Sequence, residues 1–235
     1  MTTLILLPGM DGTGELFAPF VAVLDKRITA VIIRYPVNEP LTYQQLLSRV
    51  RDILPADEPF FLLDESFSGP IALSITAEQP AGLRGVILCA SFTRNPRPGL
   101  QRLRRFIGVL PLEIMPRWLL ALPLFGRWSS RQLRALLSDA LLKVSPDVLR
   151  ARMQEVLAVD VTAAAKEIRV PMLYLRATKD SLVPGSAASL LHELQPAMRI
   201  TTFKAPHMLL QVVPAEAAQA VASFMAQYHG PASKH

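Results

Sequence analysis

The fold of this chain is decided by the stretch Phe60-Phe61-Leu62-Leu63-Asp64-Glu65-Ser66-Phe67-Ser68-Gly69-Pro70. In it, an apolar run of strand length ends at a charged pair, and a serine, small residues and an apolar helix-like stretch follow. This layout is typical of a nucleophile elbow, a sharp strand-to-helix turn that holds a serine hydroxyl clear of the sheet. The elbow needs small residues two positions on either side of the serine, because its strained backbone leaves little room there. Ser68 and Gly69 meet this need downstream, whereas Asp64 stands where the first glycine of the usual G-x-S-x-G pattern is expected. Ser66 is therefore a candidate nucleophile, and the alternative is a serine that merely follows a strand.

Further apolar runs of strand length flank the elbow, at residues 4–7, 28–35, 85–90, 171–175 and 200–203. Helix-period patterns at residues 16–24, 42–54 and 215–228 alternate with them. The strand runs are continuously apolar, as strands covered on both faces require. Alternation of strands and helices implies right-handed crossovers, so we predict an α/β fold with a mostly parallel sheet and helices on both faces.

The alternation stops between residues 94 and 169, where helical patterns run back to back. One of these helices should begin at Ser145, a good N-cap followed by proline at the first helical position. Its apolar face is predicted to bury Leu149, Met153, Val156 and Leu157. We therefore predict a single domain over residues 1–235 with a helical insertion at 94–169.

Composition excludes several classes of protein. Of the 235 residues, 51% are hydrophobic and 19% charged, which indicates a folded chain with a sizeable core.

The net charge of +6 invites a nucleic-acid interpretation, because nine arginines and a single acid lie between residues 94 and 134. No zinc spacing, RNA-binding aromatic motif or basic zipper accompanies them, so we do not expect a nucleic-acid partner. A solvated basic face is one explanation of the arginines, and a surface that attracts anionic substrates, such as phosphate-bearing acyl carriers or an acidic membrane, is the other.

Location can also be predicted. Met1-Thr2-Thr3 leads straight into the first apolar strand, so we expect no charged leader. The apolar stretch at 106–125 carries charges and prolines that a transmembrane segment would not tolerate, so we expect it not to span a membrane. Cys89 is the only cysteine and lies in an apolar strand, where we expect it to pack in the core. These features favour a protein of the reducing cytoplasm.

Two loops at the carboxyl ends of later strands carry residues that would complete the chemistry of Ser66. Asp180 follows the strand at 171–175 and His207 follows the strand at 200–203. Serine is a weak nucleophile until a base takes its proton; an imidazole does so near neutral pH, and a carboxylate on its other nitrogen fixes the tautomer. Alone, Asp180 is explained equally well as a turn cap and His207 as a surface histidine. The order Ser, Asp, His, each at a strand end, favours a catalytic triad.

From the first strand to about residue 228, the chain resembles the α/β-hydrolase superfamily. The segment Leu6-Leu7-Pro8-Gly9-Met10-Asp11-Gly12-Thr13-Gly14 is similar to the oxyanion loop of that family. The resemblance implies an oxyanion hole made of the backbone N–H groups of Met10 and Phe67, a sheet of about six strands, and a cap formed by residues 94–169. It implies neither a metal nor a cofactor. The oxyanion loop also resembles that of plant acyltransferases that form phytyl esters.

The predicted cap is rich in large apolar side chains, among them Trp118, Phe125 and Trp128. These three either pack the interior of the cap or line a pocket for an acyl chain. We predict a serine hydrolase that cleaves a small-molecule carboxylic ester or thioester with an apolar acyl group. Acyl transfer to an alcohol, cofactor-free perhydrolysis on the same fold, and a catalytically silent binding protein are the alternatives. Asp64 is expected to be a tolerated departure from the elbow pattern, and its charge would raise the pKa of His207 if the two lay close.

Overall fold

The computed structural model describes residues 2–56, 58–108, 110, 112, 113 and 117–228, with the side chains of 103 and 117–120 left out. Its centre is a six-stranded sheet in the order β2-β1-β3-β4-β5-β6, in which every described neighbour pair is parallel. The strands are β1 (Thr2–Leu7), β2 (Ile28–Ile32), β3 (Phe60–Glu65), β4 (Leu83–Cys89), β5 (Met172–Ala177) and β6 (Arg199–Phe203). The predicted α/β fold with a mostly parallel sheet of about six strands is confirmed.

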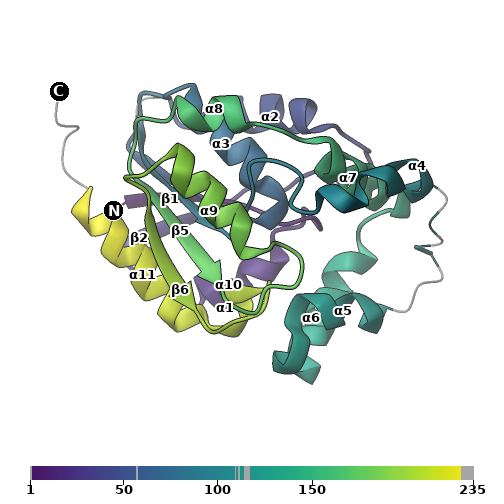
Figure 1. The fold of residues 1–235 in the computed structure, drawn as a ribbon. Helices are drawn as coiled ribbons and strands as arrows, with labels where there is room; N and C mark the ends of the chain where they lie inside the picture. The colour runs from purple at the N-terminus through teal and green to yellow at the C-terminus, as the bar shows by residue number, and fades with distance from the viewer. Residues whose placement is uncertain (1, 57, 109, 111, 114–116, 229–235) are drawn as a thin grey trace.

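Successive side chains of the central strands point to opposite faces, and both faces are apolar. Ile5 and Leu62 belong to one core, and Leu6 and Leu63 to the other. The first core is covered by α2 (Tyr43–Arg51), α3 (Gly69–Ala77), α8 (Thr162–Lys166) and α9 (Gly185–Leu194). The second is covered by η1 (Glu15–Phe17), α1 (Ala18–Val21), α10 (Leu209–Val212) and α11 (Pro214–Gln227), and Figure 1 shows these layers on either side of the sheet.

The two edge strands depart from the prediction that all strands are covered on both faces. In β2 and β6, half-buried residues alternate with exposed ones. β2 also ends at Ile32, short of the predicted end at residue 35. Beyond it the chain turns toward another loop, where the backbone N–H of Tyr35 donates to the carbonyl oxygen of Gly12 at 2.8 Å. The apolar run thus located a paired strand correctly and placed its end three residues too late.

Between β4 and β5 the chain forms η3 (Pro98–Leu103), α4 (Arg104–Ile107), α5 (Arg117–Phe125), η4 (Gly126–Trp128), α6 (Arg131–Leu142), α7 (Pro146–Ala158) and α8. In Figure 1, α4 to α7 lie together to one side of the sheet, on the right of the view. The segment leaves the core and returns to it at one place, because Arg94 and Asp160 form an isolated antiparallel bridge. The last helix, α8, packs its Ala165 in the core under α3, so it lies with the sheet and apart from the helices before it.

The face that α7 buries differs from the predicted one. Ser145 is its N-cap, as expected, but the buried residues are Val148 and Arg152. The predicted core residues Leu149, Met153, Val156 and Leu157 are half-buried. They are half-buried because they face the cavities described below, whereas Arg152 faces the loop that follows β1.

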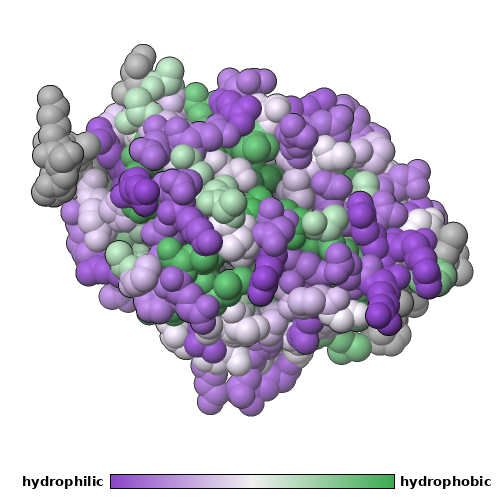
Figure 2. Space-filling model, turned by 45° about the horizontal axis from the view of Figure 1, so that its top comes forward, coloured by the Kyte–Doolittle hydropathy of each residue, from purple (hydrophilic) through white to green (hydrophobic). Residues whose placement is uncertain are grey.

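Figure 2 shows one face of the molecule, on which hydrophilic residues surround small apolar patches and gather toward the side where α4 and α7 lie. Cys89 is a free, fully buried cysteine in β4, as predicted. Among the residues that the structure describes, no helix combines the length and the apolar character needed to cross a bilayer.

Candidate active site

Ser66 follows directly on β3 and has a backbone φ of 51°, in the left-handed region that residues with a side chain seldom occupy. It opens the short 3-10 turn η2 (Ser66–Ser68), which leads into α3. The start of α3 lies very close to the segment that follows β4, since a Cβ on Gly69 would stand 2.9 Å from Cβ of Ser91. The strained serine and the glycine at the tight contact are the two features that an elbow requires.

Ser68 explains why a serine can replace the usual second glycine of the motif. Its side chain is fully buried, its hydroxyl hydrogen-bonds the Tyr35 hydroxyl at 2.7 Å, and it also donates to the carbonyl oxygen of Pro8. The small polar side chain therefore joins the elbow to the loop after β1, where a larger one would not fit.

The structure brings Ser66, His207 and Asp180 together in one hydrogen-bonded chain. His207 Nε2 lies 2.9 Å from Ser66 Oγ, and His207 Nδ1 lies 2.8 Å from Asp180 Oδ2. The other carboxylate oxygen of Asp180 accepts the backbone N–H groups of Leu182 at 2.8 Å and Val183 at 2.9 Å. The side chains of His207 and Asp180 are each 4% exposed, so solvent does not compete for these bonds.

Met10 lies in the loop after β1, and Phe67 follows Ser66 in the turn after β3. The N–H of Gly12 donates to the carbonyl oxygen of Gly9 at 3.0 Å, which closes a turn with Met10 as its second residue and leaves the Met10 N–H outside the turn bond. Phe67 is the second residue of η2, so its N–H has no carbonyl within that turn to donate to. Both residues line the cavity above Ser66.

The two acids before Ser66 have different surroundings. Asp64 is completely buried, accepts a hydrogen bond from the Ser91 hydroxyl, and has a pKa raised well above its usual value by burial. Of these two acids, Glu65 is the one that interacts electrostatically with His207. Burial raises the pKa of Glu65 to about 7, while a hydrogen bond from Gln211 and the charge of His207 oppose that rise. Sequence reasoning noted the charged pair but assigned nothing to Glu65. Alternation along β3 could have indicated that only Asp64 lies on the same face of the sheet as Phe60 and Leu62.

Two apolar cavities meet at Ser66 and His207. One has a volume of about 430 Å³ and the other of about 330 Å³, and Met10, Leu110, Met153 and Leu182 line both. The larger is otherwise walled by residues such as Phe92, Phe106 and Leu157, and the smaller by residues such as Leu16, Leu124 and Leu137. Glu65 and Asp11 lie at the wall of the smaller cavity.

Two of the three aromatics considered for substrate binding, Phe125 and Trp128, lie outside the walls of these cavities. Phe125 is fully buried in the cluster that joins α5 and α6 to Leu16 and Met208, and Trp128 is half-buried with the Arg127 guanidinium 4.4 Å from its ring. Neither is among the residues that line the two cavities, and Phe125 packs between α5 and α6. The side chain of Trp118 lies outside the described residues.

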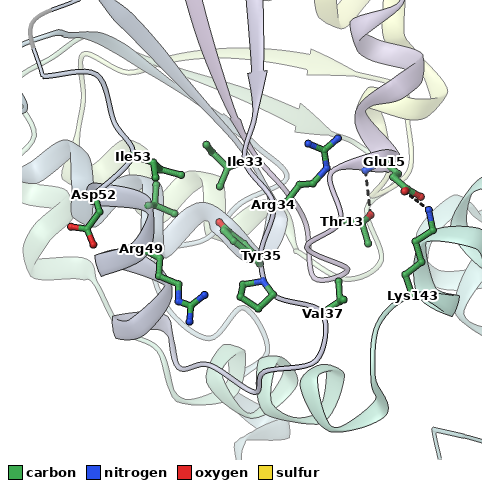
Figure 3. A pocket seen from close by; sticks show the side chains of 12 residues that line it. Thr13, Glu15, Ile33, Arg34, Tyr35, Val37, Arg49, Asp52, Ile53 and Lys143 are labelled. Atoms are coloured by element: carbon green, nitrogen blue, oxygen red, sulfur yellow. Dashed lines mark hydrogen bonds and ion pairs between the residues drawn. The ribbon is translucent and has the colours of Figure 1, made fainter.

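A larger hollow of about 750 Å³ lies apart from the serine (Figure 3). Ile33, Tyr35 and Ile53 form its apolar part, and charged side chains stand around it, of which Lys143 pairs with Glu15. None of the predicted site residues lines it. Within the described ranges, no group of three or more histidines, cysteines, aspartates or glutamates is placed to hold a metal ion.

Comparison with known proteins identifies the family. The family model described as Serine aminopeptidase, S33 matches residues 43–210, from α2 through the elbow to the segment after His207. The chain belongs to this S33 family of α/β-hydrolases. The resemblance inferred from the sequence is thereby confirmed, and the family to which the chain belongs is one of hydrolases.

Two curated proteins are similar in sequence. Phytyl ester synthase 1, chloroplastic, of Arabidopsis thaliana is 31% identical over 118 residues, which are 48% of this chain and only 17% of the plant protein. The S33 chain thus spans a minor part of that relative. The putative carbamate hydrolase RutD of Caulobacter sp. (strain K31) is 24% identical over 212 residues, 83% of this chain and 79% of the relative.

Solved structures share the fold. The esterase EaEST from Exiguobacterium antarcticum has a TM-score of 0.82 at 15% identity, covering 96% of this chain and 92% of its own. A bromoperoxidase from Bacillus anthracis has a TM-score of 0.84 at 15% identity, with the same two coverages, 96% and 92%. The enol-lactonase from Burkholderia xenovorans LB400 has a TM-score of 0.78 at 18% identity, covering 96% and 91%. At such identities the likeness establishes the fold alone.

Proposed function

We propose that the protein is a serine hydrolase that cleaves a carboxylic ester or thioester through an acyl-enzyme. The observation that carries the proposal is the bonded chain from Ser66 through His207 to Asp180, at the junction of two apolar cavities. In this proposal Ser66 is the nucleophile, His207 the base and Asp180 the group that orients the base. In this proposal the insertion predicted at 94–169 forms a cap, apart from α8, and described side chains such as Leu110, Met153 and Leu157 wall the substrate space.

The chemistry follows from the geometry. With its Nδ1–H donated to Asp180, His207 presents an unprotonated Nε2 to the Ser66 hydroxyl and takes its proton as the hydroxyl oxygen attacks the substrate carbonyl. Asp180 stabilises the imidazolium that forms, and its own position is held by two backbone N–H groups. The imidazolium then returns the proton to the leaving alcohol or thiol. Water, activated by His207 in the same way, then attacks the acyl-enzyme and releases the carboxylic acid and free Ser66.

The oxyanion would be bound by the N–H groups of Met10 and Phe67. Such donors stabilise charge that appears only at the tetrahedral stage, and the loss of one typically slows kcat by about 10² to 10³-fold. Met10 lies in the Gly9–Gly12 turn and Phe67 near the start of η2, so neither N–H group is used by a hydrogen bond within its own turn and both are free to bind an oxyanion.

The substrate class follows from the cavities. Their walls are apolar over most of their area, so an ester with apolar groups on both sides of its carbonyl fits best. A second cavity beside the nucleophile also favours acyl transfer to an apolar alcohol, which is the second candidate function. The similarity of half of this chain to a phytyl ester synthase supports it.

The test is covalent labelling with a fluorophosphonate, read by intact mass and peptide mapping. We expect one adduct on Ser66, complete loss of the adduct and of p-nitrophenyl ester turnover in Ser66→Ala, and both retained in the control Ser74→Ala, whose hydroxyl bonds the carbonyl oxygen of Pro70 within α3. A protein that takes no label and cleaves no ester would be a binding protein on a hydrolase fold. Adding a long-chain alcohol to the assay distinguishes transfer from hydrolysis by the ester formed.

A further inference from the structure

Arg152 of α7 is almost completely enclosed, with 1% of its surface exposed. Its Nη1 donates to the carbonyl oxygens of Met10 and Asp11, both at 2.8 Å, and its Nη2 donates to that of Pro36 at 2.9 Å. No carboxylate within the described residues forms an ion pair with it. Burying an unpaired charge is costly, so mere attachment of a helix would be served better by an apolar side chain.

The guanidinium holds the turn that presents the Met10 N–H. The two carbonyl oxygens it binds belong to the central residues of the Gly9–Gly12 turn, so both peptide units that follow the Met10 N–H are fixed in orientation. Gly12 has a φ of 72°, and a Cβ there would stand 2.5 Å from Arg152 Nη1. Glycine at this position is therefore required twice, by the backbone angle and by the space that Arg152 occupies.

The same guanidinium also contacts the other half of the site. Its central carbon lies 5.9 Å from the centre of the Phe67 ring and 5.7 Å from that of Tyr35, within the range of a cation–π interaction. Tyr35 in turn hydrogen-bonds Ser68, and Phe67 carries the second proposed oxyanion donor. A single side chain from the cap thus touches the supports of both donors.

We propose that Arg152 is a positioning residue that holds the Met10 and Phe67 N–H groups at the separation an oxyanion needs, so that α7 and the oxyanion site act as one unit. The proposal rests on the proposed function. Loss of the guanidinium should weaken binding of the transition state much more than binding of the substrate, because Arg152 hydrogen-bonds the Met10 turn and none of its described hydrogen bonds goes to Ser66, His207 or Asp180.

The test compares Arg152→Met, Arg152→Ala and a control, Glu155→Ala. Glu155 lies one turn further along α7 and accepts the backbone N–H of Tyr43 at 2.7 Å, so its loss removes a different link between α7 and the core. Each variant is first checked by thermal unfolding. Then kcat and KM for a p-nitrophenyl ester and the inhibition constant of a matching trifluoromethyl ketone are measured.

We expect Arg152→Met to lower kcat by about 100-fold with KM changed less than threefold, and to weaken the ketone by a similar factor. Glu155→Ala should keep kcat within about threefold of the wild type. Millimolar guanidinium should restore part of the kcat of Arg152→Ala and leave that of the wild type unchanged. An unchanged kcat in a folded Arg152→Met, an equal loss in Glu155→Ala, or absence of rescue would each overturn the proposal. Failure of the proposed function is seen separately, as a wild-type protein that forms no Ser66 adduct.

Discussion

Replacing Glu65 by glutamine should stabilise the folded protein at and above neutral pH and remove one component of its pH dependence. The Glu65 carboxyl is 2% exposed and accepts a hydrogen bond from Gln211 Nε2 at 2.9 Å. Burial raises its pKa from 4.5 to about 7, and the nearby charge of Asp11 adds to the rise. The charge of His207 acts in the opposite sense, and Asp64 and Cys89 are the other titratable groups that feel the Glu65 charge.

The sign of the effect follows from proton counting. Between pH 4.5 and 7 this carboxyl has lost its proton in the unfolded chain and retains it in the folded protein, so the free energy of unfolding falls as the pH rises. The contribution is fully present below pH 4.5 and is lost as the pH rises through 7. A pKa difference of about 2.5 corresponds to about 3 kcal/mol. Glutamine has nearly the same shape, retains an acceptor for Gln211 and cannot ionise.

Urea unfolding of wild type and Glu65→Gln at several pH values between about 5 and 8 measures this effect. The advantage of the variant should grow by about 2 to 3 kcal/mol over that range. Glu193→Gln, at an exposed position on α9, is the control and should show no such growth. An advantage that is constant with pH, or that shrinks as the pH rises, would refute the reasoning that the buried carboxyl is protonated in the folded protein.

Three more outcomes are expected. His207→Ala should lose more kcat than Asp180→Asn, because the first removes the base and the second disturbs only its orientation and charge; equal kcat for Asp180→Asn and wild type would assign the role to another acid. Asp64→Gly should keep kcat within a few-fold of the wild type, roughly 1 kcal/mol, because the Ser91 hydroxyl still bonds the carbonyl oxygen of Cys89 at 3.0 Å when the Asp64 carboxyl is gone. A hundredfold fall in kcat would show that Asp64 takes part in catalysis. In a series of p-nitrophenyl esters, kcat/KM should rise with acyl length until the cavity is full, by an amount worth up to about 0.8 kcal/mol of binding free energy per methylene. Met153→Trp narrows both cavities and should reduce this dependence on length. A wild-type kcat/KM that does not change with length would remove the apolar acyl group from the proposal.

Much of the architecture could be predicted from local patterns. The apolar runs identified all six strands of the sheet, and for the four central strands the reason is that a strand covered on both faces is apolar along its whole length. The Ser145-Pro146 pair marked the start of α7, because capping depends on adjacent residues only. Ser66, Asp180 and His207 could be singled out together for a similar reason: parallel strands deliver their carboxyl ends to one edge, so residues that follow such strands meet in space.

The fold class, the order of the elements and the convergence of the three loops could therefore be predicted, since each depends on periodicity or on neighbours in the chain. What each buried side chain faces could not, because it depends on how distant segments pack. Periodicity indicates that a helix face is covered but not whether a core, a cavity or a loop covers it. That is why the predicted face of α7 lines the cavities while Arg152 reaches the Met10 turn, 142 residues away in sequence. It is also why Phe125 packs against α6 and Met208, and why the charge of His207 acts on Glu65. These outcomes depend on contacts between distant segments, which no local pattern records.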